Sequence, residues 1–270
     1  MNNKIAFIGG GNMSSAIFHG IVTSYPGKYD ITVSGPHLEK LAHFAEQGAH
    51  ITSDNSAAFK DADVVFLGVK PQMLTAVLNE LKDSGVDYSN KLLVSMAAGF
   101  KLAAMTKILG ECAMIRIMPN TPSKIGLGVT AVCPGAKSTL AQQELLQKLL
   151  AGMGKSIITD EPGLNAIGAI VGSGPAFVFR FMEALVSEAE RYGFSKEEGR
   201  AMVEQLLLGS VQLAKASPDQ ELGALREAVT SKGGTTYQGL LQMTEYHFEE
   251  MMQEVIKACL QRTKEFEDMF

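Results

Sequence analysis

Short apolar runs alternate with helical stretches from residue 4 to about residue 159, and this alternation limits the possible folds more than any other feature. The first run, IAFIG at 5–9, precedes helical spacing in NMSSAIFHGIVTS at 12–24. A near-continuous apolar run, ADVVFLGV at 62–69, is typical of a central parallel strand covered on both faces. Further strands are predicted at 31–35, 91–97, 113–119, 128–134 and 155–159, with helices such as 37–48 between most of them. The pattern predicts a parallel, doubly wound α/β sheet.

The strand signals stop after residue 160, and the rest of the chain has helical periodicity. Ser195 with Glu198, and Ser217 with Gln220, have the spacing of helix capping boxes. The final stretch, 245–266, has the long repeat of a helix that is charged on one face. We therefore predict two domains, an α/β domain at 1–159 and an all-helical domain at 160–270.

The composition excludes several classes of protein. With 46% hydrophobic and 20% charged residues, the chain has the balance of a soluble globular protein. A formal net charge of −5, without a long lysine or arginine cluster, argues against binding to nucleic acid or to an anionic membrane. Three widely separated cysteines form neither a disulfide framework nor a zinc pattern, so we predict no metal site and expect a reducing compartment, the cytoplasm.

One uncharged stretch, 162–179, has the length of a membrane span. It contains two prolines and four glycines, so we interpret it as a buried segment of a soluble protein instead. Within it, GSGPAF at 172–177 suggests close packing of a buried helix against another backbone.

The glycine-rich segment GGGNMSSA at 9–16 follows the first strand and opens the first helix. Gly9 permits a tight turn, and Gly11 lets the backbone approach a pyrophosphate at the helix N-terminus. Ser14 replaces the usual third glycine and is still small enough for close packing of helix on sheet. In this position in the chain, the segment predicts a dinucleotide site.

The end of the second strand has no carboxylate. NAD sites usually place Asp or Glu there, to bind the ribose 2′-hydroxyl, whereas this chain has Ser34. A neutral residue tolerates a 2′-phosphate, so NADPH is the expected cofactor and NADH the alternative. His37 and Lys40 are candidates to approach that phosphate, or else they are merely solvated helix residues.

Three loops follow later strands of the predicted sheet, and each contains small or proline residues. They are Val69-Lys70-Pro71, Ala97-Ala98-Gly99 and the segment at 118–122 that includes Asn120. Ligands bind at the carboxyl ends of strands in an open parallel sheet. Each loop alone is ordinary turn chemistry, but the three together favour a site where a flat ring lies against backbone.

Six segments resemble one family: IAFIGGGNMSSAI, GVKPQ, MAAG, RIMPNTP, GSGPAF and LREAVTSKGGTTYQGL. In this order, over nearly the whole chain, they are similar to the pyrroline-5-carboxylate reductase family. The resemblance implies NAD(P)H-dependent reduction of 1-pyrroline-5-carboxylate to L-proline, the last step of proline biosynthesis. It also implies an N-terminal Rossmann-type domain and a helical C-terminal dimerisation domain, in a homodimer or a larger ring such as a decamer.

The N-terminal segments described above together make up the predicted cofactor-binding site, and its residues are Gly9, Gly11, Asn12, Met13, Ser34, Asn55, Val69, Lys70, Pro71, Ala97, Ala98 and Asn120.

The segment VTSKGGTTYQGL at 229–240 interrupts a helical region and is the most family-specific of the six. Gly233 and Gly234 are expected to offer free amides to the substrate carboxylate at a helix N-terminus, and Ser231 adds a hydroxyl. The resemblance places Thr236 on the ring nitrogen as the catalytic residue, with Thr235 beside it in the substrate site. Lys232 stands where family members often have proline.

Two other functions are compatible with the same architecture. β-Hydroxyacid dehydrogenases use a lysine on the first long interdomain helix, and the corresponding GSGPAFVFRF here contains none. A non-catalytic NADP(H)-sensing protein would retain the glycine-rich segment at 9–16 but would have no need of TSKGGTT. Because fold analogy cannot separate these functions, the C-terminal loop decides between them.

Overall fold

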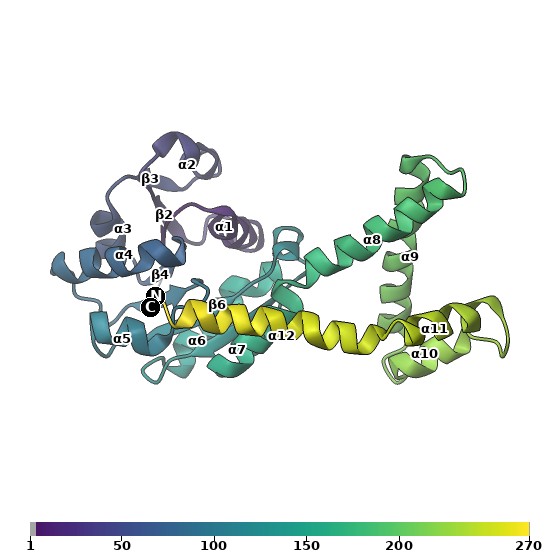
Figure 1. The fold of residues 1–270 in the computed structure, drawn as a ribbon. Helices are drawn as coiled ribbons and strands as arrows, with labels where there is room; N and C mark the ends of the chain where they lie inside the picture. Colours follow the sequence, from purple (N-terminus) through teal and green to yellow (C-terminus); the bar gives the residue numbers. More distant parts are fainter. Residues whose placement is uncertain (1–3, 270) are drawn as a thin grey trace. The chain divides into compact units, whose positions relative to one another are not determined.

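The computed structural model describes residues 4–269 and divides them into two units (Figure 1). The first unit comprises the described residues up to Pro175 together with those from Cys259 onward, and the second is Ala176–Ala258. The end of the chain thus belongs to the unit that contains the sheet. The predicted boundary between residues 159 and 160 marks where the sequence pattern changes, and it stays a prediction.

An eight-stranded sheet forms the first unit, in the order β3-β2-β1-β4-β5-β6-β7-β8. Its strands are β1 (Lys4–Ile8), β2 (Asp30–Ser34), β3 (His50–Thr52), β4 (Val64–Leu67), β5 (Leu92–Ser95), β6 (Met114–Met118), β7 (Gly128–Pro134) and β8 (Gly154–Ile158). The predicted doubly wound sheet is confirmed, with one added strand, β3, at its edge.

One pair of strands departs from the predicted parallel arrangement, because β7 runs antiparallel to β6. Only a 3₁₀ turn, η1 (Thr121–Ile125), and four further residues connect them. A parallel pair needs a crossover of a dozen or more residues, so this short connection permits only an antiparallel return.

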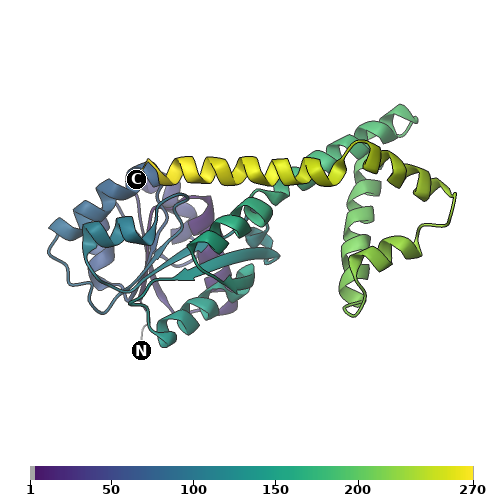
Figure 2. The same cartoon turned by 60° about the horizontal axis from the view of Figure 1, so that its bottom comes forward.

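Helices cover both faces of the sheet (Figure 2). They are α1 (Asn12–Ser24), α2 (Leu38–Ala45), α3 (Asn55–Asp61), α4 (Pro71–Asp83), α5 (Leu102–Leu109), α6 (Leu140–Leu150) and α7 (Glu161–Ile167), with a 3₁₀ turn, η2 (Ala151–Met153). Phe7 belongs to the core under α1, α2 and α6, whereas its neighbours Ala6 and Ile8 belong to the core under α3, α4 and α5. This alternation along β1 buries both faces of the strand.

Two of the three cysteines, Cys112 and Cys133, are buried. Cys112 is buried in the core under α3, α4 and α5. Its burial, together with the nearby Glu111 carboxylate, raises the pKa of its thiol to about 11. Burial likewise raises the pKa of Cys133 in β7. Both thiols therefore stay protonated and unreactive at neutral pH.

The rest of the chain is helical. It comprises a π-helical turn, η3 (Gly168–Gly172), and α8 (Gly174–Arg191), α9 (Lys196–Ala216), α10 (Leu222–Ala228), α11 (Thr235–Glu245) and α12 (Phe248–Glu267). The capping box predicted at Ser195 and Glu198 is confirmed at the start of α9. The one predicted at Ser217 and Gln220 is wrong. Ser217 ends α9, and its carbonyl accepts a turn hydrogen bond from the Gln220 amide at 3.1 Å, so α10 begins only at Leu222.

The expectation that 162–179 is buried is also wrong within this chain. The helical run Glu161–Arg191 is long and apolar enough to cross a membrane, yet only 6% of its most apolar window is buried. No atom lies within 4 Å of where a Cβ would stand on Gly172 or Gly174, so the close packing expected of GSGPAF is not found among the described residues.

Candidate functional site

The glycine-rich turn after β1 is shaped by contact with the loop after β4. Gly9 has a φ of +99°, which favours glycine, and a Cβ there would stand 2.9 Å from the Gly68 carbonyl carbon. The Gly9 amide donates to the Ser34 carbonyl at 2.9 Å, and the Gly68 amide donates to the Ile8 carbonyl at 2.8 Å. The turn is therefore fixed in place between the neighbouring strands.

Helix α1 begins immediately after this turn, with Gly11 at its N-cap and Asn12 and Met13 as its first residues. No side chain caps the helix and no acidic residue lies in its first turn, so its amides and positive dipole end are available to an anion. Ser14 is fully buried, and its Oγ donates to the Gly9 carbonyl at 2.6 Å. Without Cβ atoms on the glycines, this cradle leaves its backbone amides accessible, and pyrophosphate binding here stays a prediction.

The end of β2 has no carboxylate that could bind a ribose 2′-hydroxyl directly. Ser34 is fully buried, and its Oγ donates to Asn55 Oδ1 at 2.8 Å. Asn55 is half-buried at the start of α3, and its Nδ2 donates to Glu80 Oε2 at 3.0 Å. His37 is exposed and lies 3.5 Å from Glu39. The side chain that reaches the surface at this edge is thus Asn55, with Ser34 behind it.

Two further predicted loops lie at the same carboxyl edge, because β4 and β5 are parallel to β1. Val69 packs against the core, Lys70 is exposed at the N-cap of α4, and Pro71 is the first residue of that helix. Ala97 is buried after β5 and Ala98 is half-buried. The structure therefore brings these small residues together beside the glycine cradle.

Asn120, predicted from the third loop, is held differently. It is 6% exposed, and its Oδ1 accepts from the Val129 amide at 2.9 Å while its Nδ2 donates to the Val171 carbonyl at 3.0 Å. The side chain ties the start of β7 to η3. A cofactor contact by Asn120 stays a prediction, and these backbone partners already occupy its amide group.

A pocket of about 320 Å³ lies at the carboxyl ends of β5 and β6, between Ala98, Pro119, the π-helical turn η3 and the last turns of α12. Arg262, Thr263 and Phe266 of α12 form one wall, and no sequence pattern predicts their presence at this pocket. Gly99 explains how α12 approaches so closely. It has a φ of +73°, and a Cβ there would stand 2.6 Å from Phe266 Cβ.

Glu267, the last residue of α12, forms hydrogen bonds that hold the end of this helix beside the pocket. Its carboxylate accepts hydrogen bonds from Asn165 Nδ2 at 2.8 Å and from Lys101 Nζ at 3.0 Å. Burial acts to raise the pKa of Glu267, but these two hydrogen bonds and the Lys101 charge outweigh it and lower the pKa. The carboxylate is therefore charged at neutral pH, and the attachment weakens only under acidic conditions.

The predicted substrate loop lies in the second unit, before α11. Gly233 has a φ of +72° and Gly234 is the N-cap of α11. A Cβ on Gly234 would stand 2.4 Å from Ser231 Oγ and 3.1 Å from the Ser231 carbonyl oxygen, so the turn leaves little room for a side chain unless Ser231 moves. Thr230 Oγ1 donates to the Arg226 carbonyl at 2.6 Å and joins the loop to α10.

One detail of the expected anion site is corrected. The Gly234 amide is not free, because it donates to the Ser231 carbonyl at 3.0 Å. Thr235 and Thr236 are instead the first two residues of α11, and no side chain caps this helix. Both are exposed, and the first turn has no acidic residue. The amides at this end suit a carboxylate, with the two threonine hydroxyls beside them.

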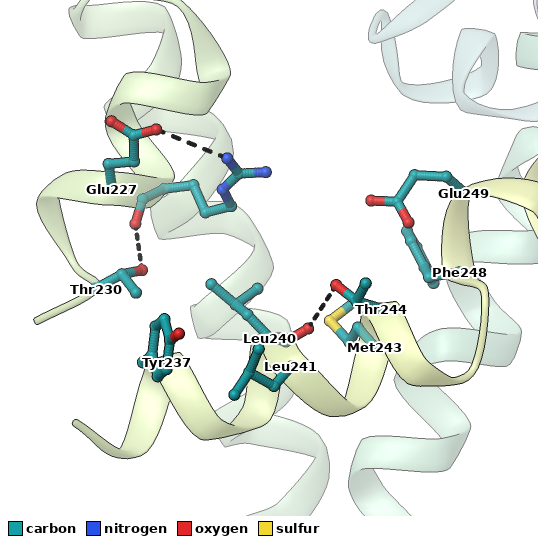
Figure 3. A pocket seen from close by; sticks show the side chains of 10 residues that line it. Glu227, Thr230, Tyr237, Leu240, Leu241, Met243, Thr244, Phe248 and Glu249 are labelled. Atoms are coloured by element: carbon teal, nitrogen blue, oxygen red, sulfur yellow. Dashed lines mark hydrogen bonds and ion pairs between the residues drawn. The ribbon is translucent and has the colours of Figure 1, made fainter. Parts of the chain in front are cut away.

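A pocket of about 420 Å³ lies beside this loop, within the second unit (Figure 3). Thr230 and Tyr237 line it next to the loop, while Leu241, Met243 and Phe248 make its wall apolar. The loop therefore combines polar donors with an adjoining apolar surface, which is the usual make-up of a small-molecule site.

Comparison with known proteins finds a family model for each of two parts of the chain. A family model described as pyrroline-5-carboxylate reductase dimerisation matches residues 161–266. A second, described as NADP oxidoreductase coenzyme F420-dependent, matches residues 4–99.

Curated relatives are similar over their whole length. A pyrroline-5-carboxylate reductase of Vibrio alginolyticus is 38% identical, over 100% of this chain and 99% of its own. One from Escherichia coli is 31% identical, over 98% of both chains.

Solved structures give the same result. A pyrroline-5-carboxylate reductase from Coxiella burnetii matches with a TM-score of 0.90 and 34% identity, over 98% of this chain and 99% of that one. The Plasmodium falciparum enzyme with NADP bound matches with a TM-score of 0.88 and 28% identity, over 98% of both chains. A prephenate dehydrogenase from Aquifex aeolicus, at 14% identity and a TM-score of 0.56, shares the fold alone.

Proposed function

The chain belongs to the pyrroline-5-carboxylate reductase family, and from that premise we propose that it reduces the C=N bond of 1-pyrroline-5-carboxylate to give L-proline, the last step of proline biosynthesis. The observation that carries this proposal is the uncapped start of α11, where Thr235 and Thr236 follow the Gly233-Gly234 turn. A small ring with a carboxylate and an adjacent imine nitrogen matches amides and hydroxyls arranged in this way.

The reaction needs little acid–base catalysis from the protein. A protonated C=N bond is already electrophilic, so the main task is to hold the imine carbon next to the hydride donor. NADPH, when bound, supplies the hydride. The α11 amides bind the carboxylate, and the Thr236 hydroxyl orients the ring nitrogen and assists its protonation, directly or through water. Ser231 completes the loop that holds these groups in place.

The glycine cradle at α1 and the loops after β4 and β5 are the proposed cofactor site. Gly9, Gly11, Asn12 and Met13 would hold the pyrophosphate by backbone contacts, and Asn55 would face the adenosine ribose. This assignment rests on the Cβ-free approach of Gly9 to Gly68 and on the uncapped N-terminus of α1.

We expect NADPH to be preferred over NADH, because the end of β2 presents no carboxylate to repel a 2′-phosphate. The preference is expected to be modest, since no arginine lies in the segment SGPH at 34–37. A purified assay of imine reduction, with kcat/KM measured for both cofactors, tests the reaction and the preference together. A larger kcat/KM for NADH would contradict the preference, and no turnover with either cofactor would contradict the function.

We also propose that the helical part of the chain forms a homodimer, from which a larger ring such as a decamer could be built. Large apolar side chains, among them Phe179 and Leu206, are more than half exposed here at 59% and 55%. A second copy would cover them, and this explains the apolar run Glu161–Arg191 without a membrane. We further propose that this homodimer is cytoplasmic and that it has no nucleic-acid partner.

Sedimentation at micromolar concentration tests the assembly. We expect a species of at least twice the 29.0 kDa chain mass. The dimer should persist on dilution to nanomolar concentration, because apolar interfaces of this kind hold subunits together permanently. A single species at the chain mass would refute the proposal.

A further inference from the structure

Asn55 is held between two side chains that impose different demands on its amide. Ser34, fully buried, donates its hydroxyl to Asn55 Oδ1 at 2.8 Å. On the other side, Asn55 Nδ2 donates to Glu80 Oε2 at 3.0 Å. Glu80 comes from α4, 25 residues further along the chain, and is exposed.

A carboxylate can only accept hydrogen bonds, so Glu80 decides which way the Asn55 amide points. The NH₂ group must face Glu80, and the oxygen is thereby turned to Ser34. One N–H of Asn55 remains, and no described residue accepts a hydrogen bond from it. β3 pairs in parallel with β2, so both strands end at the same edge of the sheet. Asn55 follows β3 at the start of α3, and its remaining donor therefore lies at this carboxyl edge, where a dinucleotide places its adenosine ribose.

We propose that Glu80 is a positioning residue for the ribose 2′ substituent of the cofactor, acting through Asn55. The inference rests on the NADPH-dependent function proposed above. A dianionic 2′-phosphate only accepts hydrogen bonds, so it requires the donor that Glu80 fixes. A 2′-hydroxyl both donates and accepts, and it tolerates either orientation of the amide.

The Glu80 charge works against the same phosphate, and magnitudes decide between the two effects. A hydrogen bond to a charged group changes affinity by roughly 10- to 100-fold, whereas repulsion from an exposed charge changes it by about 1.5- to 5-fold. Fixing the donor therefore outweighs the repulsion, and removing Glu80 should weaken binding of the phosphate.

The test uses two adenosine nucleotides that need no hydride transfer, so it does not depend on turnover. Calorimetry gives Kd for adenosine 2′,5′-bisphosphate and for adenosine 5′-monophosphate with the full chain. Glu80→Ala should weaken binding of the bisphosphate by roughly 3- to 10-fold and change that of the monophosphate less than twofold. Glu80→Gln keeps an oxygen acceptor without the charge and should stay within about twofold of wild type. Asp83→Asn, an exposed carboxylate on the same helix, is the matched control and should change neither Kd.

A double-mutant cycle identifies the route. In an Asn55→Ala background, Glu80→Ala should no longer weaken binding of the bisphosphate and should tighten it by about 1.5- to 5-fold, because only the repulsion between Glu80 and the phosphate is left. If Glu80→Gln and Glu80→Ala both tighten the bisphosphate, repulsion dominates and the inference is wrong. An undiminished Glu80→Ala effect without Asn55 would also overturn it. Equal Kd values of the wild-type protein for the two nucleotides would overturn the inference about Glu80 without contradicting imine reduction. If the protein shows the predicted coupling between Glu80 and Asn55 but does not reduce the imine, only the proposed reaction is refuted.

Discussion

Replacing Glu161 with alanine is expected to destabilise the sheet-containing unit by about 3 kcal/mol, one of the largest losses for any single side chain here. Arg116 in β6 is 1% exposed, and its Nη1 pairs with Glu161 Oε1 at 2.5 Å. Its other terminal nitrogen, Nη2, has no partner among the described residues. Without Glu161, the guanidinium would be a buried charge with no ion-pair partner among the described residues.

The same carboxylate oxygen has a second partner, the amide of Leu102 at 2.9 Å, at the start of α5. Glu161 therefore connects β6, α5 and α7 at one point. We take the lower end of the range for broken buried pairs because Glu161 itself is 26% exposed, so water can reach the vacated space.

Calorimetric melting at fixed protein concentration measures the loss, since assembly would otherwise shift Tm. For a chain of this size, about 3 kcal/mol corresponds to a Tm lower by roughly 6–12 °C. Glu144→Ala, an exposed glutamate on α6, is the control and should change stability by less than about 0.5 kcal/mol. A double replacement, Arg116→Met with Glu161→Leu, should recover much of the loss, because it removes both charges together. Equal Tm values for Glu161→Ala and Glu144→Ala would contradict the assigned role.

Local patterns predicted the parts of the fold in which each residue's environment is set by its neighbours in sequence. The strand at 5–9 and the run at 62–69 became β1 and β4 because both are buried on two faces. The glycine-rich segment gave the cradle for the same reason, since turn geometry is a local property. The edge strand β3 was missed because its three residues, His50–Thr52, are exposed or half-buried and leave no apolar run.

Features that depend on distant parts of the chain left no such signal. The reversed direction of β7 follows from the length of one connection and not from periodicity. The wall that Arg262 and Phe266 add to the pocket depends on α12 returning to the sheet, and helical periodicity does not say where a helix ends up. Glu80 looks like any exposed glutamate in sequence, and its contact with Asn55 exists only because α3 and α4 pack together.

The exposed stretch at 162–179 was misinterpreted for a related reason. Apolar character shows that a segment must be covered, but it does not show whether the cover comes from the same chain. Here the described residues leave it largely uncovered. Residues 161–266 match a family model described as dimerisation, which is consistent with the homodimer proposed above.

The largest expected effect on catalysis is from Thr236→Val, which keeps the side-chain volume and removes the hydroxyl. If this hydroxyl contacts the imine nitrogen in the transition state, its loss should cost roughly 1–3 kcal/mol. That corresponds to a fall of about 5- to 150-fold in kcat/KM. NADPH affinity should change less than twofold, because the glycine cradle lies on the other unit.

Gly234→Ala separates binding of the carboxylate from the catalytic step. A Cβ at this position would stand 2.4 Å from Ser231 Oγ and 3.1 Å from the Ser231 carbonyl oxygen, so the Ser231 side chain must rotate and the turn before α11 is expected to give by a few tenths of an ångström. The displaced amides would bind the carboxylate less well in the ground state and the transition state alike. We therefore expect a raised KM with little change in kcat, whereas Thr236→Val should lower kcat as well.

The alternative is that this loop only shapes the start of a helix. Thr236 accepts no backbone hydrogen bond as a cap, since Gly234 holds that position. Thr236→Val should consequently leave Tm within about 2 °C of wild type, because an exposed substitution away from a cap rarely changes stability much. A lowered Tm with kcat/KM within about twofold of wild type would show that the loop is structural and that the substrate binds elsewhere. A normal Tm with a large fall in kcat/KM would place the imine nitrogen at the Thr236 hydroxyl.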